Sequence, residues 1–123
     1  MNRIHVEKMI PQAIKVLKGI YEDNPIPKVY QGYISAFGVS LVQTDLLPTL
    51  AFFGSSSESG DGDRSKISRM VCETLQLDIG GRSLLEYAIN HNDQASLKEE
   101  IKEASVALKL SMRLFVLEKG GAS

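Results

Sequence analysis

Cysteine and histidine are scarce in this chain of 123 residues, which has one cysteine, Cys72, and two histidines, His5 and His91. One cysteine excludes an intramolecular disulfide and every zinc or iron–sulfur site built from several cysteines, so we expect a reducing compartment. Cys72 has no neighbouring histidine and no CxxC partner, and the two histidines lie far apart in the sequence. We therefore expect a protein that is not an enzyme and that uses no cofactor and no metal.

Long apolar runs and an excess of one charge are also lacking. No stretch approaches the roughly 20 apolar residues needed to cross a bilayer, and the N-terminus lacks the charged-then-apolar pattern of a signal sequence. We therefore expect a cytoplasmic protein that does not bind membranes. The 14 Lys and Arg residues are matched by 15 Asp and Glu residues, which gives a net charge of −1. Any attraction to a polyanion must therefore come from cations gathered at one place.

Apolar residues, by contrast, are abundant at 43% of the chain, and they recur every three or four positions along most of it. This spacing is typical of amphipathic helices, and no useful alternating pattern predicts a strand. The expected helices cover about residues 3–22, 27–45, 46–53, 83–90 and 96–119, and a further helix follows a cap at Asp63 or Ser65 and ends before Gly80. A buried strand is the alternative for 46–53, and Pro48 counts against it. We expect an all-α fold: residues 1–123 form one domain, a compact bundle of about six helices, largely antiparallel.

The ends of these helices have their own signals. Pro11 either kinks the first helix or separates its first turns from the rest. Asp93 is expected to cap the last helix, with His91 at the end of the helix before it. Ser-x-x-Glu spacing at 83–86 and at 96–99 predicts two capping boxes. The other expected N-caps are Asn2 and either Asp63 or Ser65.

Two glycine-containing segments could in principle bind a ligand, either a calcium ion or a phosphate. Residues 54–63 have no large apolar side chain, so we expect a flexible Ser-, Gly- and Asp-rich surface loop. The sequence excludes a calcium-binding loop that starts at Asp61. Lys66 occupies the sixth position, which requires glycine, and Cys72 occupies the twelfth, which requires a bidentate glutamate. Residues 80–83, Gly-Gly-Arg-Ser, fit either a phosphate contact or an ordinary turn with a helix cap.

The cations of the last expected helix form a row. Lys98, Lys102, Lys109 and Arg113 are spaced 4, 7 and 4 residues apart, and at 100° per residue they fall within an arc of about 60° over about 22 Å. Such a row could follow a phosphate backbone. Weaker candidates for nucleic-acid contact are Lys15 and Lys18, with Lys8 beside them, and the pair Lys66 and Arg69.

An ordinary solvated helix face is the alternative for this row. Glu99, Glu100 and Glu103 stand among its cations, and helices often carry such mixed charge for solubility. Aromatic residues do not alternate with these lysines in the sequence. We therefore expect contact with the nucleic-acid backbone rather than reading of bases.

Three segments carry a resemblance to a known family. They are residues 33–38 (Tyr-Ile-Ser-Ala-Phe-Gly), residues 47–53 (Leu-Pro-Thr-Leu-Ala-Phe-Phe) and the Leu-rich segment 103–115 with Lys109 and Arg113 near its end. Together they resemble the small, fifth-numbered subunit of the type III-B CRISPR effector, the Cmr complex. The chain departs from that family where a lysine often follows the phenylalanine closely. Here Gly54 and an acidic loop come before Arg64 and Lys66.

The resemblance implies a small all-α subunit without an active site that acts in antiviral defence. Several copies would stack along an RNA-guided filament, beside the backbone subunits that hold the guide RNA and along the path of the target RNA. Base pairing with the guide would supply specificity, and this subunit would supply shape and phosphate contacts. The competing hypothesis is a helical adaptor bundle that binds another protein and does not contact RNA.

Overall fold

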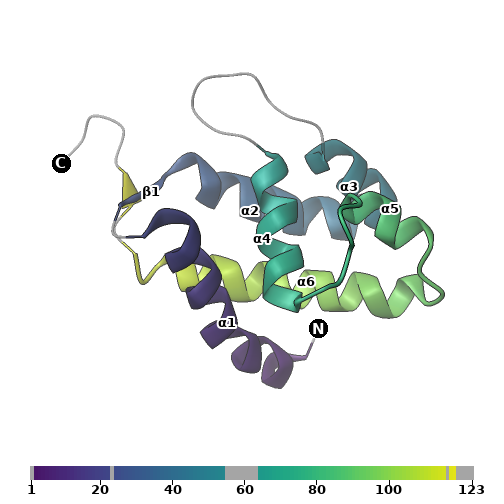
Figure 1. The fold of residues 1–123 in the computed structure, drawn as a ribbon, viewed down its shortest axis with the longest axis horizontal. Coiled ribbons are helices and arrows are strands. Elements are labelled where there is room, and N and C mark those ends of the chain that lie inside the picture. The colour runs from purple at the N-terminus through teal and green to yellow at the C-terminus, as the bar shows by residue number, and fades with distance from the viewer. Residues whose placement is uncertain (1, 23, 55–63, 116, 119–123) are drawn as a thin grey trace.

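The computed structural model describes residues 2–22, 24–54, 64–115 and 117–118 (Figure 1). Within these residues the chain forms six helices and two strands of two residues each. They are α1 (Arg3–Tyr21), β1 (Ile26–Pro27), α2 (Val29–Gln43), α3 (Leu46–Gly54), α4 (Ser65–Leu75), α5 (Leu84–Ile89), α6 (Gln94–Met112) and β2 (Leu117–Glu118). The all-α prediction is confirmed. None of the described helices combines the length and apolarity needed to cross a membrane.

Helix α6 is the centre of the bundle, because α1, α2 and α4 all pack against it. Figure 1 shows α2 and α6 running in opposite directions, with α4 crossing from one to the other and α1 lying across the C-terminal half of α6. Helices α3 and α5 pack together at the other end of the molecule. All six described helices contribute side chains to one core.

The core consists of the apolar positions that recur every three or four residues in the sequence. On α6 these include Leu97, Ile101 and Leu108, none of which has any exposed surface. Across the core, the rings of Phe37 and Phe53 meet edge to face with their centroids 5.2 Å apart, which joins α2 to α3. Edge-to-face contact is a favourable geometry for aromatic pairs.

Helix α1 is continuous from Arg3 to Tyr21, although Pro11 lies inside it. The predicted cap is confirmed: the Asn2 side chain accepts hydrogen bonds from the backbone N–H groups of Ile4 and His5. Pro11 is exposed, so its ring lies on the side of the helix that faces away from the core. The alternative in which Pro11 separates the first turns from the rest of the helix is wrong, because α1 is continuous through Pro11.

Helix α6 differs from the prediction at both ends. It begins at Gln94 because Asp93 is its N-cap, as expected, and the Asp93 side chain accepts a hydrogen bond from the backbone N–H of Ser96. The capping box at Ser96 is therefore wrong, whereas the one formed by Ser83 and Glu86 at the start of α5 is confirmed.

The C-terminal end of α6 lies at Met112 rather than near residue 119. Beyond it, i to i+3 hydrogen bonds tighten the chain into turns as far as Phe115, and Leu117 then pairs in parallel with Ile26 of β1. An apolar run such as 114–117 fits a helix or a strand equally well, so the sequence pattern could not locate this end.

Two expected features fall partly outside the described residues. Gly54 is the last residue of α3 rather than the first of a loop, and residues 55–63 lie outside the description. Asp63 is outside it as well. Ser65 is the first residue of α4 and not its cap, because the cap position is occupied by Arg64.

Removing the Asp93 side chain should destabilise α6 far more than removing that of Ser96. Losing an N-cap of this kind costs about 1 kcal/mol, so Asp93→Ala should lower the free energy of unfolding in urea by about that amount. The matched variant Ser96→Ala should change it by less than about 0.5 kcal/mol, as is usual for an exposed position. A larger loss for Ser96→Ala than for Asp93→Ala would mean that Ser96, and not Asp93, caps the helix.

Candidate nucleic-acid interface

The cations of the last helix lie along one face of α6, where Lys102 and Lys109 line a groove between α6 and α2. Lys98, Lys102 and Lys109 are half-buried, and Arg113, the first residue after the helix, is exposed. The fully buried residues of α6, among them Ala104 and Leu108, lie on another part of its circumference, and Leu110, which is 38% exposed, also lies outside the row. The structure therefore brings all four residues of the first expected row onto one face, which we call the α6 row.

Two members of the α6 row have carboxylate partners. The Lys98 Nζ lies 3.0 Å from an Asp45 carboxylate oxygen, and the Lys102 Nζ lies 3.6 Å from one of Glu99. The hydrogen bond from Lys98, together with one from the Leu46 backbone N–H, holds the pKa of Asp45 below its usual value. Ion pairs this close to solvent are worth little, so a phosphate can replace these carboxylates at small cost.

The α6 row borders a groove of about 450 Å³ between α2 and α6. Its walls are largely apolar and include Ile34, Val42 and Val106, and Lys102 and Lys109 also line it. Val39 and Val42 on α2 are 54% and 66% exposed. An anionic ligand along the α6 row would therefore run beside an apolar strip.

The weaker candidates lie on other helices. Lys15 and Lys18 are exposed on α1, which packs against α6. Lys66 and Arg69 belong to α4, and Figure 1 shows that α4 begins at α2 and reaches α6 only at its other end. Arg69 is also held 2.7 Å from a Glu73 carboxylate oxygen. Lys66 and Arg69 are therefore separate from the α6 row.

One acidic neighbour of the α6 row is not a solvated charge. Glu103 is only 3% exposed, and its carboxylate accepts a hydrogen bond from the Asn2 backbone N–H at 2.8 Å and lies 3.3 Å from the His5 Nδ1. The expectation that Glu103 belongs to a mixed solvated face is therefore wrong. Its role is to join the start of α1 to α6, and the α6 row loses one opposing charge from its surface.

Aromatic rings lie next to cations at the end of the molecule where α4 begins. The Arg64 guanidinium lies over the Phe52 ring, with its Cζ 4.4 Å from the centroid, and the Lys66 Nζ is 5.7 Å from the centroid of Tyr30. These pairs are far apart in sequence and come from α2, α3 and α4, so periodicity within one helix could not reveal them.

The surroundings of Cys72 and His91 indicate a structural role for each of these two side chains. Cys72 is 7% exposed beside a groove of about 970 Å³ between α3, α4 and α5. Burial, with a smaller contribution from the Glu73 charge, raises the pKa of its thiol, and a higher thiol pKa makes it a weaker nucleophile at neutral pH. The His91 Nδ1 accepts a hydrogen bond from the backbone N–H of Asp93, in the turn before α6.

The segment at residues 80–83 forms a turn followed by a helix cap. Gly80 and Gly81 both have positive φ, and the Arg82 Nε donates to the backbone carbonyl of Ile79 at 2.9 Å. The Arg82 guanidinium also lies over the Tyr87 ring. The residues proposed for a phosphate contact are thus engaged with the protein, which favours the ordinary turn.

Metal ligands do not gather among the described residues, where no group of three or more His, Cys, Asp or Glu side chains is arranged to hold an ion. Comparisons with known proteins give no match for this chain: no family model, no curated protein and no solved structure is similar to it.

Proposed function

We propose that this protein is a non-catalytic small subunit of a type III-B CRISPR ribonucleoprotein, the Cmr complex, and that it acts in antiviral defence in the cytoplasm. Its partners are the backbone subunits, neighbouring copies of itself, and the guide and target RNA. It contacts the RNA backbone through shape and charge and performs no reaction. Sequence specificity is left to base pairing with the guide.

The observation that supports RNA contact most directly is the position of the α6 row. Lys98, Lys102, Lys109 and Arg113 extend over about 22 Å at 1.5 Å per residue, on a face of α6 that borders the groove between α2 and α6. In single-stranded nucleic acid, successive phosphates lie several ångström apart, so a row of this length can span several of them. The overall charge of −1 gives no general attraction, and the contact depends on this local arrangement.

The small helical fold and the resemblance of segments 33–38, 47–53 and 103–115 support the assignment to this complex. Those segments contribute Ile34, Phe37 and Phe53 to the core, and segment 103–115 also carries Lys109 and Arg113 of the α6 row. A subunit of this kind needs a rigid bundle that presents cations on one face.

An adaptor bundle without RNA contact is the second candidate, and one observation favours it. The groove between α2 and α6 has apolar walls, and the exposed Val39 and Val42 lie beside it. Exposed apolar strips of this kind often dock a protein segment. In the Cmr proposal, a neighbouring subunit covers the same strip.

Co-purification from the native host tests the assignment. The tagged chain should recover a short guide RNA together with several repeat-fold protein subunits. The recovered guide RNA should survive ribonuclease treatment because the other subunits enclose it. Recovery of one protein partner without RNA, in a yield that nuclease does not change, would contradict the assignment and favour the adaptor.

A further inference from the structure

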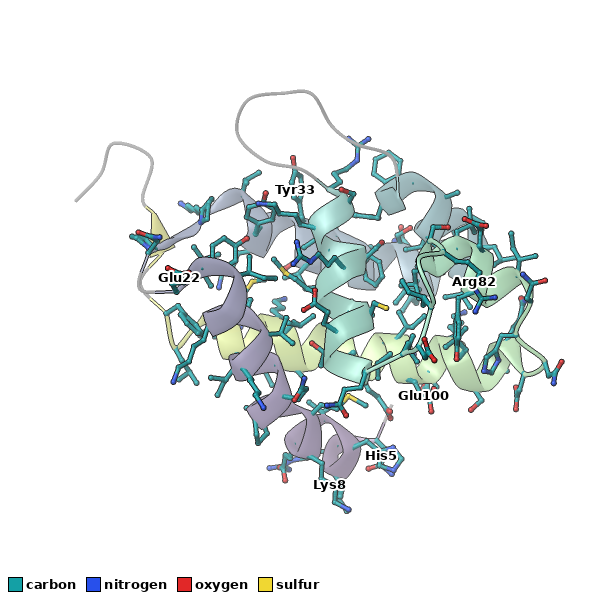
Figure 2. All side chains as sticks on the ribbon, in the orientation of Figure 1. His5, Lys8, Glu22, Tyr33, Arg82 and Glu100 are labelled. Carbon is teal, nitrogen blue, oxygen red and sulfur yellow. The ribbon has the colours of Figure 1, made fainter. Side chains whose placement is uncertain are left out.

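The outer face of α2 is uncharged, although it lies at the surface. The 15 residues of α2 include no Asp, Glu, Lys or Arg, and Val39 and Val42 are 54% and 66% exposed. The other long helices carry charge on their outer faces: Lys8 of α1 extends away from the bundle in Figure 2, and Glu100 of α6 is exposed. A helix without charge on any side is usually covered on every side. The composition of α2 is therefore that of a helix whose outer face is covered.

The exposed positions of α2 form one seam along the helix. Gly32, Ala36, Val39 and Gln43 are all exposed, and they follow one another at spacings of four, three and four residues. This is the spacing with which two helices pack side by side. Phe37, by contrast, belongs to the buried face of α2. The seam therefore faces away from the core, and the groove between α2 and α6 runs beside it.

The seam has a recess at one end and a projection at the other. A Cβ added to Gly32 would meet no described atom within 4 Å beyond its own stretch of helix. Val39, two turns further along, presents a branched side chain on the same face. Two α2 helices that run antiparallel about a two-fold axis near Ala36 place Val39 of each copy opposite Gly32 of the other. Each projection then fills the recess that faces it.

We propose that this seam of α2 binds a second copy of the same chain, with the two α2 helices antiparallel about an axis near Ala36. A neutral face fits another neutral face, because covering a charged surface would take unpaired charges out of water at a high cost. The contact uses the same face in both copies, so the pair closes on itself. This inference goes beyond the proposed function and does not depend on RNA contact by the α6 row.

The charges at the two ends of α2 favour the antiparallel direction. Lys28 lies just before the helix and Asp45 lies just beyond it, and both are exposed. In the antiparallel pair, Lys28 of each copy approaches Asp45 of the other, whereas a parallel pair would bring like charges together. The contacts of Asp45 with the Leu46 N–H and the Lys98 Nζ both use Oδ1, so Lys28 would approach Oδ2. Exposed ion pairs are weak, and these select a direction more than they add affinity.

The proposed contact is small, so the dimer should exchange with the monomer. An interface centred on one helix per copy falls at the low end of specific interfaces, below roughly 1,200 Å². Sedimentation equilibrium of the full chain should therefore show a dimer with a dissociation constant in the micromolar range. Val39→Asp places an unpaired carboxylate in the contact and should weaken the dimer at least about tenfold. Ile89→Asp, at a side chain of α5 that is 55% exposed, should leave it unchanged.

Disulfide crosslinking tests the geometry, in a chain whose own thiol is removed by Cys72→Ala. Ala36→Cys places one thiol from each copy beside the axis, where oxidised glutathione should link the two copies. Gln43→Cys is the matched control on the same seam. It lies seven residues from the axis, so its two thiols would be about 21 Å apart at 1.5 Å per residue. A disulfide requires Cα atoms within about 7 Å, so this variant should form few linked dimers.

Efficient linkage of Ala36→Cys together with poor linkage of Gln43→Cys is the expected result. Equal linkage of the two variants would indicate a parallel or unspecific contact and would overturn the proposal. A wild-type chain that stays monomeric up to about 1 mM, the limit of weak binding, would overturn it, as would a dimer that Val39→Asp does not weaken. A monomer that binds a different protein through Val39 would also overturn it. None of these results would affect the test of RNA contact by the α6 row.

Discussion

Reversing two charges of the α6 row, Lys109→Glu with Arg113→Glu, should weaken target-RNA binding by the assembled complex at least about tenfold at low salt. Each phosphate contact contributes a slope of about 0.7 to 0.9 to the dependence of log affinity on log salt. Losing two contacts should therefore lower that slope by about 1.4 to 1.8, and the two new carboxylates add repulsion. The measurement is a titration of labelled target RNA at several salt concentrations.

A matched control distinguishes the effect of charge on the α6 row from the effect of the protein's net charge. Arg3→Glu with Lys28→Glu changes the net charge by the same amount at two exposed residues outside the α6 row, and it should leave the slope nearly unchanged. The unfolding transitions and complex assembly of both double variants should match those of the wild type. An unchanged slope for the Lys109 and Arg113 variant would mean that the α6 row is only a solvated helix face.

Truncating Phe37 to alanine should have the largest effect on stability. Its side chain has no exposed surface and forms the ring contact with Phe53 that joins α2 to α3. Replacing a buried phenylalanine by alanine typically costs about 3–5 kcal/mol, because apolar contact is lost and a cavity remains. Such a loss is a large part of the 5–15 kcal/mol that stabilises a typical domain.

Val39→Ala is the internal control for this variant. Val39 lies on the same helix but is 54% exposed, so its truncation should change the free energy of unfolding by about 0.5 kcal/mol or less. Urea denaturation of both variants gives the comparison. Similar losses of unfolding free energy for Phe37→Ala and Val39→Ala would mean that α2 does not bury the face that carries Phe37.

The helices were predictable because the apolar spacing is strong. For α1, α2 and α3, the expected ranges differ from the observed bounds by at most two residues, and the Ser83 capping box was located correctly. The end of α4 was placed too late, since α4 stops at Leu75 with Gln76 in a left-handed conformation. Gln76 is not a usual residue for that conformation, so no residue type marks the end of α4.

The α6 row was predictable for a related reason. Lys98, Lys102 and Lys109 lie on α6 and Arg113 directly follows it, and spacing along a helix determines which residues share a face. Burial of Glu103 was not predictable, because it depends on the start of α1 lying across α6. The same limit applies to Arg64 and Phe52, which α3 and α4 bring together. Contacts between helices depend on tertiary packing, which single-helix periodicity does not contain.

The most direct measurement of RNA contact by the α6 row is lysine acetylation in the assembled complex, with and without target RNA, followed by mass spectrometry. Lys102 and Lys109 should react several-fold more slowly when target RNA is bound, since phosphates would then occupy their ammonium groups. Lys28, exposed at the start of α2, should react at the same rate in both states. Equal reactivity of Lys102 and Lys109 with and without RNA would contradict the account.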